Sequence, residues 1–233
     1  MVAVQIVESS VVGTRCAVLR CTRRGGGPVV LVFPMLHVAA PEFYREVERQ
    51  LRECDLLVVE GIIGDSAVGG ALTTTYKVIP ANDDSGLVED DIPYDDLGVP
   101  IVTPDLTGDE FDEGFGKLPW KTKLFTWAAV PVVSVGQFFA GRRAILNLEV
   151  NDLPTRSEEL RGENLDEFMD LLLDRRDERV LTALAEIVRD RAEEKIDVAV
   201  VYGAGHVPGI LRGLYKLGYR VVSADWVMAV PAE

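Results

Sequence analysis

The chain has 233 residues, of which 48% are hydrophobic and 27% are charged, and this composition excludes both a disordered chain and a polytopic membrane protein. The formal net charge of −14 argues against broad electrostatic binding to nucleic acid or to anionic membranes. Twelve acidic residues and no basic residue fall between positions 82 and 116, so the rest of the chain is nearly neutral.

The first third of the sequence predicts strands and one helix. The stretches Val2–Val7 and Thr14–Cys21 are typical of strands, and three glycines at 25–27 form a turn into a strand over Val29–Met35. Pro41 suits the first turn of a helix that runs to about Cys54. The short apolar run Leu56–Glu60 is typical of a parallel strand that is buried on both faces.

The phenylalanine, valine and leucine at positions 43, 47 and 51 give the predicted first helix an apolar face at i, i+4 and i+8. Beyond it, the acidic stretch 82–116 is expected to be mostly loop, with one strand at Val99–Thr103. Helices are expected over Trp120–Leu146 and, as one long and kinked helix, over about Leu165–Lys195.

A second strand–helix unit closes the chain. It consists of a strand at Asp197–Tyr202, a glycine-rich turn, a helix over Pro208–Leu217 that Gly218 ends, and a strand at Tyr219–Ser223. The alternation of strands and helices predicts an α/β fold, with a mainly parallel central sheet, flanking helices and a helical insertion at about 120–195. We expect one domain over 1–233, with an acidic loop at 82–116.

The segment 124–141 has 18 residues without a charge, which is near the lower limit for a helix that crosses a membrane. Pro131, Gly136 and Gln137 interrupt it, and basic residues flank both ends. We therefore favour a buried helical hairpin or an apolar interface, such as that of a homodimer, over a membrane span.

Cysteine usage and the N-terminus both indicate a cytoplasmic protein. The three cysteines are odd in number and have no C-x-x-C spacing, which is not typical of a disulfide framework or a metal site. The first residues lack the basic and apolar order of a signal peptide.

The only two histidines stand in matching positions. His37 and His206 each follow a valine, an aromatic residue and three further residues, and each precedes a valine, at the exit of a predicted strand. A single histidine is commonly a core or surface residue whose ring nitrogens are hydrogen-bonded. The repetition of one context instead favours a shared site.

Glu60 and Asp105 also follow predicted strands. The carboxyl ends of parallel strands meet at one edge of a sheet, where open α/β folds bind ligands. Two imidazoles and one or two carboxylates there would suit a divalent metal such as Mn, Co or Zn, with His37, Glu60, His206 and Asp105 as candidate ligands. The alternatives are a helix cap or a solvated loop acid for Glu60 and a solvated acid for Asp105.

Arg176 occupies the apolar face of the long predicted helix, four residues after Leu172 and four before Val180. Arginine is rarely buried without a partner, so we expect a carboxylate or a substrate anion beside it. Asp177 lies at the edge of the same face, and Arg175 is expected in solvent. A purely structural ion pair is the alternative.

Gly203 and Gly205 lie in the turn before His206, where glycine allows the backbone to approach a metal or substrate closely. A dinucleotide fingerprint is the alternative for this turn, with Asp225 as the ribose ligand. The last glycine, Gly209, comes one position late for that motif, and little sheet follows it.

Three short motifs together resemble the TraB/PrgY/Tiki family, within a superfamily that also holds erythromycin-esterase-like and ChaN-like proteins. The turn Gly203-x-x-His206 resembles the C-terminal motif of the family, and His37 with Glu60 resembles its N-terminal block. Arg176-Asp177 resembles its Arg-Asp helix motif, and the match runs from about 37 to 211 without a recognisable middle. Pro34 stands where the family has glycine.

The resemblance implies a metal-dependent hydrolase, like a peptidase or an esterase, that acts on a peptide or small-molecule substrate. In the esterase branch it implies a His/Glu base that acts without metal. His37, Glu60 and His206 would bind the metal and act in catalysis, with Asp105 as an added ligand. Arg176 would stabilise an oxyanion or bind a substrate carboxylate, oriented by Asp177. Because of Pro34, a non-catalytic ligand-binding or regulatory protein of the same fold is the alternative.

Overall fold

The structure, a computed structural model, describes residues 5–61, 64–66, 68–70, 86–124, 127 and 170–232. The start of the strand predicted at Val2 and most of the helical region predicted at Trp120–Leu146 lie outside these ranges, as does most of the uncharged segment 124–141. In the described part of the chain, no helix is long and apolar enough to cross a membrane.

Within the described residues, a seven-stranded mixed sheet organises the fold. Its strands are β1 (Val7–Ser10), β2 (Gly13–Arg23), β3 (Val29–Met35), β5 (Leu56–Val59), β7 (Ile101–Val102), β8 (Asp197–Gly203) and β9 (Tyr219–Pro231). Strands β3, β8, β5 and β7 are adjacent in that order and parallel. This half of the sheet agrees with the predicted fold class.

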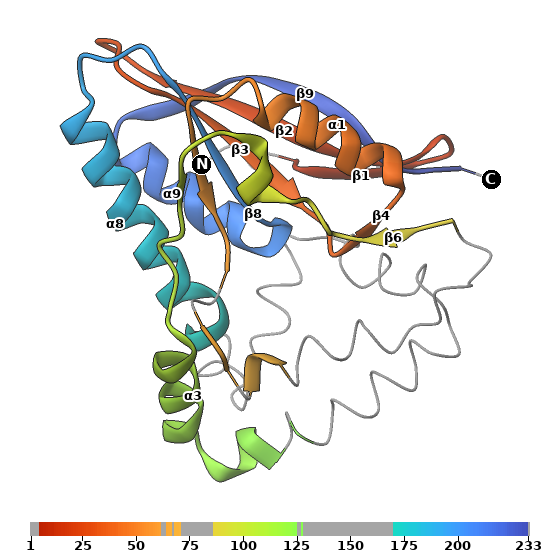
Figure 1. The fold of residues 1–233 in the computed structure, drawn as a ribbon, viewed down its shortest axis with the longest axis vertical. Helices are drawn as coiled ribbons and strands as arrows, with labels where there is room; N and C mark the ends of the chain where they lie inside the picture. The colour runs from red at the N-terminus through yellow and green to blue at the C-terminus, as the bar shows by residue number, and fades with distance from the viewer. Residues whose placement is uncertain are drawn as a thin grey trace. The chain divides into compact units, whose positions relative to one another are not determined.

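The other half of the sheet is antiparallel and corrects the expectation of a mainly parallel one. β2 pairs antiparallel with β1 and β3 and, along its whole length, with β9 (Figure 1). β9 was expected to end at Ser223 but continues to Pro231, with register shifts opposite Thr14/Arg15 and Arg20/Cys21. Bulges of this kind absorb an extra residue while the pairing continues.

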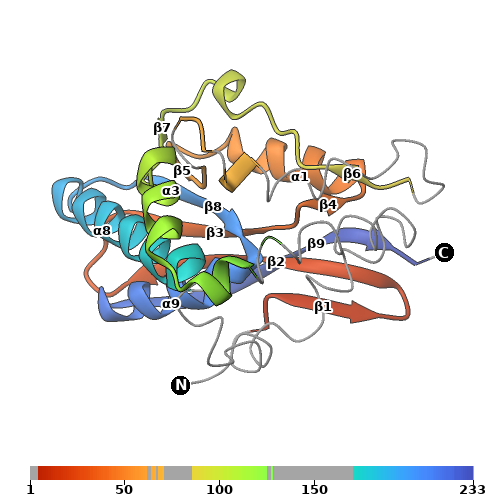
Figure 2. The ribbon, with the colours of Figure 1, turned by 90° about the horizontal axis from the view of Figure 1, so that it is seen from below.

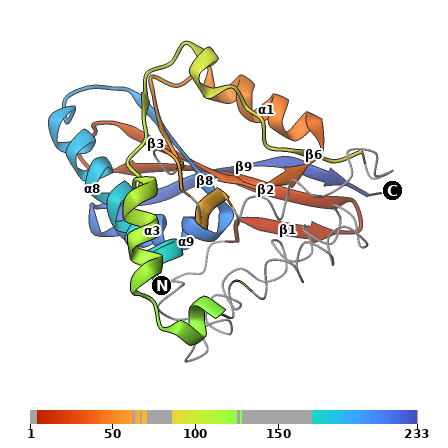
Figure 3. The ribbon, with the colours of Figure 1, turned by 60° about the horizontal axis from the view of Figure 1, so that its bottom comes forward.

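Helices cover both faces of the sheet. Helix α1 (Pro41–Leu51) lies on one face, and α9 (Val207–Lys216) lies on the other beside α8 (Arg175–Asp190) (Figure 2, Figure 3). All four residues of β5 are buried, as a strand with helices on both faces requires. The predicted apolar face of α1 is confirmed, because Phe43, Val47 and Leu51 are all buried.

The long predicted helix is described from Asp170 onward, and it ends at Asp190 rather than near 195. Residues Asp170–Asp174 form a π-helical turn, which shifts the helix face by about one residue. Beyond this turn the predicted apolar face is confirmed by Val180 and Leu184, which are fully buried.

A helix within the acidic stretch contradicts its description as mostly loop. Helix α3 (Gly108–Lys117) begins at a capping box, in which the Thr107 hydroxyl accepts the Glu110 N–H and the Glu110 carboxylate accepts the Thr107 N–H. Its acidic first turn also suits the positive end of the helix dipole. Its two buried phenylalanines belong to a cluster made of Val68, Leu106, Phe111, Phe115, Leu118 and Leu171.

The rest of the acidic stretch contains short elements. Strand β6 (Val88–Glu89) pairs antiparallel with β4 (Val38–Ala39), and a 3-10 turn covers Tyr94–Leu97. Strand β7 confirms the predicted strand at Val99–Thr103 in a shorter form.

The chain forms two compact units. The first comprises 1–60, 87–104 and 177–233 and contains the seven-stranded sheet, and the second comprises 61–86 and 105–176 and contains α3. The chain passes from one unit to the other after Glu60, Gly86, Pro104 and Arg176. The prediction of a single domain over 1–233 stays a prediction.

Candidate functional site

The carboxyl ends of the parallel strands bring Glu60 and the turn before His206 together in the first unit. β3 and β8 are in register up to Met35 and Gly203, and the Glu60 N–H continues the β5–β8 ladder by donating to the Val201 carbonyl. After β8, a 3-10 turn over Ala204–His206 leads directly into α9. The convergence predicted for Glu60 and His206 is therefore confirmed.

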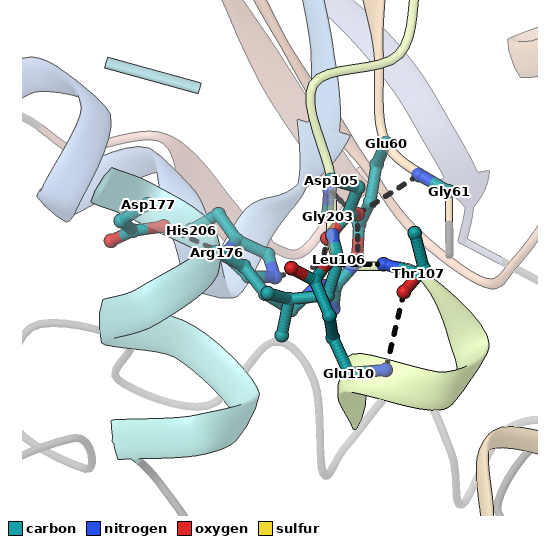
Figure 4. A network of polar contacts seen from close by, with 10 residues as sticks. All are labelled: Glu60, Gly61, Asp105, Leu106, Thr107, Glu110, Arg176, Asp177, Gly203 and His206. Atoms are coloured by element: carbon teal, nitrogen blue, oxygen red, sulfur yellow. Dashed lines mark hydrogen bonds and ion pairs between the residues drawn. The ribbon is translucent and has the colours of Figure 1, made fainter. Parts of the chain in front are cut away.

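His206 lies between two carboxylates. Its Nδ1 is 2.8 Å from Oδ1 of Asp177, and its Nε2 is 3.3 Å from Oε1 of Glu60 (Figure 4). His206 is 4% exposed and Asp177 is 7% exposed, so the Asp177 bond is sheltered from water. A carboxylate on Nδ1 holds a proton there and leaves Nε2 as the nitrogen that faces Glu60.

Glu60 is fixed by the end of β8. Its Oε2 accepts the Gly203 N–H at 2.6 Å, while its Oε1 faces His206. The ring of Tyr202 packs edge-on against the His206 ring at a centroid distance of 5.6 Å. Glu60 remains partly exposed, so solvent reaches this carboxylate while the imidazole is enclosed.

Arg176 and Asp105 form a separate ion pair in the second unit. Arg176 Nε and Nη2 lie 2.9 and 2.6 Å from the two carboxylate oxygens of Asp105, and both residues are buried. Asp105 also accepts the N–H groups of Gly61 and Leu106. The predicted burial of Arg176 beside a carboxylate is confirmed.

Asp177 has a partner that the sequence did not predict. It lies in hydrogen-bond contact with His206, whereas Arg176 forms its ion pair with Asp105, and the predicted role of Asp177 in orienting Arg176 stays a prediction. Neighbouring residues of a helix point about 100° apart, so they meet different partners. Arg175 is exposed, as expected, and pairs with Asp170.

His37 is exposed and lies between β3 and β4. Its carbonyl accepts the Asp90 N–H, next to the β4–β6 ladder. Its role as a metal ligand stays a prediction. Pro34 lies within β3, beyond the last β3–β2 pair at Val32, where its missing N–H leaves that pairing intact.

Asp90 and Tyr94 are polar neighbours of Glu60 that the sequence reasoning missed. Asp90 accepts hydrogen bonds from the Ile92 N–H and the Tyr94 hydroxyl. Burial raises the pKa of Asp90 to about 6, and the nearby Asp91 and Glu60 charges add to the rise, against these two bonds. Burial also raises the pKa of Tyr94. Among twelve acids, no sequence pattern marks Asp90.

The glycines near His206 have different positions. Gly203 supports Glu60, whereas Gly205 is exposed, and their predicted contact with substrate stays a prediction. Gly209, which appeared only as the late glycine of a dinucleotide motif, lies against Asp177. This contact depends on how α9 packs against α8, so no local pattern in the sequence marks it.

Within the described ranges, no group of three or more His, Cys, Asp and Glu side chains is arranged to hold a metal ion. The predicted four-ligand set therefore stays a prediction. No protein-family model, no curated protein and no solved structure matches this chain.

Proposed function

We propose that this chain is a hydrolase of peptide or ester bonds, in which Glu60 and His206 perform the chemistry and Asp177 orients the imidazole. The observation that carries the proposal is the chain of contacts that runs from the buried Asp177 and His206 to the partly exposed Glu60. A carboxylate–imidazole pair that is closed to water on one side and open to it on the other is suited to moving a proton to or from a substrate.

The contact between His206 and Glu60 requires a positive charge. With Nδ1 protonated toward Asp177, Nε2 presents a lone pair to a carboxylate oxygen that is 3.3 Å away. Two such acceptors repel each other unless a proton or a cation lies between them. If a proton lies between them, Glu60 and His206 act as a general acid and base. If a cation lies there, both residues are metal ligands.

We favour the cation, because the donors present fit Zn, Mn or Co. One imidazole nitrogen and one carboxylate oxygen are common ligands of these metals. Metal-binding histidines regularly donate the N–H of their other ring nitrogen to a carboxylate, and the contact between His206 Nδ1 and Asp177 matches this arrangement. A bound divalent ion would lower the pKa of its water ligand and polarise the scissile carbonyl. His37 is a further predicted ligand.

Asp105 and Arg176 take no part in this proposed chemistry. Both carboxylate oxygens of Asp105 accept hydrogen bonds from Arg176 and from backbone N–H groups. Because both oxygens already accept these hydrogen bonds, Asp105 would have to give up some of them in order to bind a metal. The two residues therefore serve the proposal as a structural ion pair of the second unit.

The proposal is tested by a screen of ester and peptide substrates on metal-depleted protein, before and after Zn, Mn or Co is restored. We expect turnover that depends on the added metal and that falls at least a hundredfold in both His206→Ala and Glu60→Gln. His37→Ala shows whether the exposed histidine contributes. Thr182→Ala, at an exposed site of α8, is the control for handling and folding.

Metal-independent turnover with the same loss in both variants would favour the acid–base form of the site. Turnover that survives both substitutions would overturn the proposal. A ligand-binding or regulatory protein is the second candidate, motivated by Pro34 at the glycine position of the first motif. It predicts metal or ligand binding that requires His206, without turnover of any substrate.

A further inference from the structure

Two glycines of α9 allow it to approach α8 closely. Gly209 and Gly213 are one helical turn apart and are both buried. A Cβ atom built on Gly209 would lie 1.7 Å from Oδ2 of Asp177, and one built on Gly213 would lie 2.0 Å from Cδ2 of Leu181. Asp177 and Leu181 are also one turn apart, so the two helices pack side chain against backbone at two successive levels.

The two contacts differ in the group of α8 that faces the glycine. At the Gly213 level, the displaced group would be the end of an apolar side chain. At the Gly209 level, it would be the carboxylate whose other oxygen, Oδ1, lies 2.8 Å from Nδ1 of His206. Any side chain at position 209 must therefore push the Asp177 carboxylate.

We propose that Gly209 is a positioning residue: its missing side chain seats the Asp177 carboxylate on Nδ1 of His206 and thereby fixes the tautomer of the imidazole. The consequence for reactivity rests on the proposed function, whereas the tautomer itself does not. Without the Asp177 bond, a neutral imidazole in water places its proton mostly on Nε2, the nitrogen that must face Glu60 with its lone pair. Gly209 would thus control the site without touching a substrate.

The steric part of the proposal can be separated from the electrostatic part. The Cβ of Asp177 would lie 3.5 Å from a Cβ at position 209, which is ordinary van der Waals distance. The double variant Asp177→Ala/Gly209→Ala therefore removes the collision but does not restore the carboxylate. We expect this double variant to be more stable than Gly209→Ala alone, although His206 still lacks its partner.

The test is NMR of the imidazole rings in the full chain with ¹⁵N-labelled histidine. Only two histidines are present, and the variant His37→Gln assigns their signals. In the wild type we expect a His206 Nδ1 proton at low field that exchanges slowly, with the ¹⁵N shift of a protonated Nδ1, whether a proton or a cation lies between Nε2 and Glu60. In Gly209→Ala and in Asp177→Asn, we expect that proton signal to vanish and the nitrogen shifts to move.

Gly213→Ala is the matched control, since it creates a similarly short contact one turn away. We expect it to lower the melting temperature while the wild-type His206 signals persist. Wild-type His206 signals in Gly209→Ala would overturn the proposal, as would equal loss of the signals in Gly213→Ala. If Gly209→Ala does not fold, wild-type ring signals in the double variant would overturn it. Absence of turnover with the expected ring signals would instead overturn only the proposed function.

Discussion

Arg176 and Asp177 are neighbours in α8, yet one completes an ion pair of the second unit and the other holds an imidazole of the first. The sequence predicted that both residues leave the solvent, because they interrupt or border an apolar helix face. It could not assign their partners. Asp105 belongs to a segment that is distant in the sequence, and its ion pair with Arg176 depends on how α3 and the turn before it fold.

The pair formed by Arg176 and Asp105 predicts the result of an arginine-to-lysine substitution. Lysine keeps the charge but loses the planar fork that grips both oxygens of a buried carboxylate. We expect Arg176→Lys to lower the free energy of unfolding by about 1–3 kcal/mol in urea titrations. Arg175→Lys, one residue away and exposed, should change it by less than about 0.5 kcal/mol. Equal small changes in both variants would contradict the assignment.

Asp90 predicts a dependence of stability on pH. Its pKa is about 6 in the folded chain and 3.8 in the reference state, so the folded chain binds the proton more tightly. Its contribution to stability is therefore highest below pH 3.8 and is lost as the pH rises to about 6. We expect Asp90→Asn to raise the free energy of unfolding at pH 7 by on the order of 1–3 kcal/mol.

The same variant should have little stabilising effect near pH 4, where the wild-type carboxyl group is largely protonated. Urea titrations of both proteins across this range measure the difference. Asp225→Asn, at an exposed site of β9, is the control. A gain that is constant with pH would show that Asp90 does not carry a raised pKa.

At the scale of elements, α3 is the clearest difference between expectation and structure. The density of acids and glycines in 82–116 suggested loop, but Thr107-x-x-Glu110 is a capping-box pattern and Phe111 with Phe115 forms an apolar i, i+4 pair. Both signals were present in the sequence. The high content of acids and glycines nevertheless favoured a loop, because the average composition of a segment does not show where a helix within it begins.

The capping box of α3 predicts that Thr107→Ala lowers the free energy of unfolding by about 1 kcal/mol, because the Glu110 N–H loses its acceptor. Thr107→Ser keeps a hydroxyl at the cap and should lie close to the wild type. Thermal unfolding followed by circular dichroism measures both. An equal loss in the serine variant would mean that the threonine methyl group, and not the cap, stabilises this end of α3.

Strand β9 shows why topology was harder to predict than the elements. Ser223, Ala224 and Asp225 interrupt its apolar pattern, which suggested that the strand had ended. These residues are exposed on a strand that pairs with β2, and polar side chains carry little penalty at exposed strand positions. Local pattern identifies a strand, but its length here depends on a partner near the other end of the chain.

At the scale of the whole molecule, the sequence predicted the parallel half of the sheet and the edge at which Glu60 and His206 meet. Strand ends followed by polar residues are a local signal, and parallel pairing turns it into proximity. The antiparallel half, the division into two units and the packing of Gly209 on Asp177 depend on contacts between distant segments. None of these has a local signature strong enough to predict it.

The central claim is that Glu60 and His206 hold one cation between them, with Asp177 behind the imidazole. The most direct measurement is a crystal structure of the wild-type chain soaked with Zn, Mn or Co, with an anomalous difference map at the metal edge. The account predicts a peak about 2.0–2.2 Å from both His206 Nε2 and a Glu60 oxygen. No peak there, with both side chains ordered and still in contact, would contradict it.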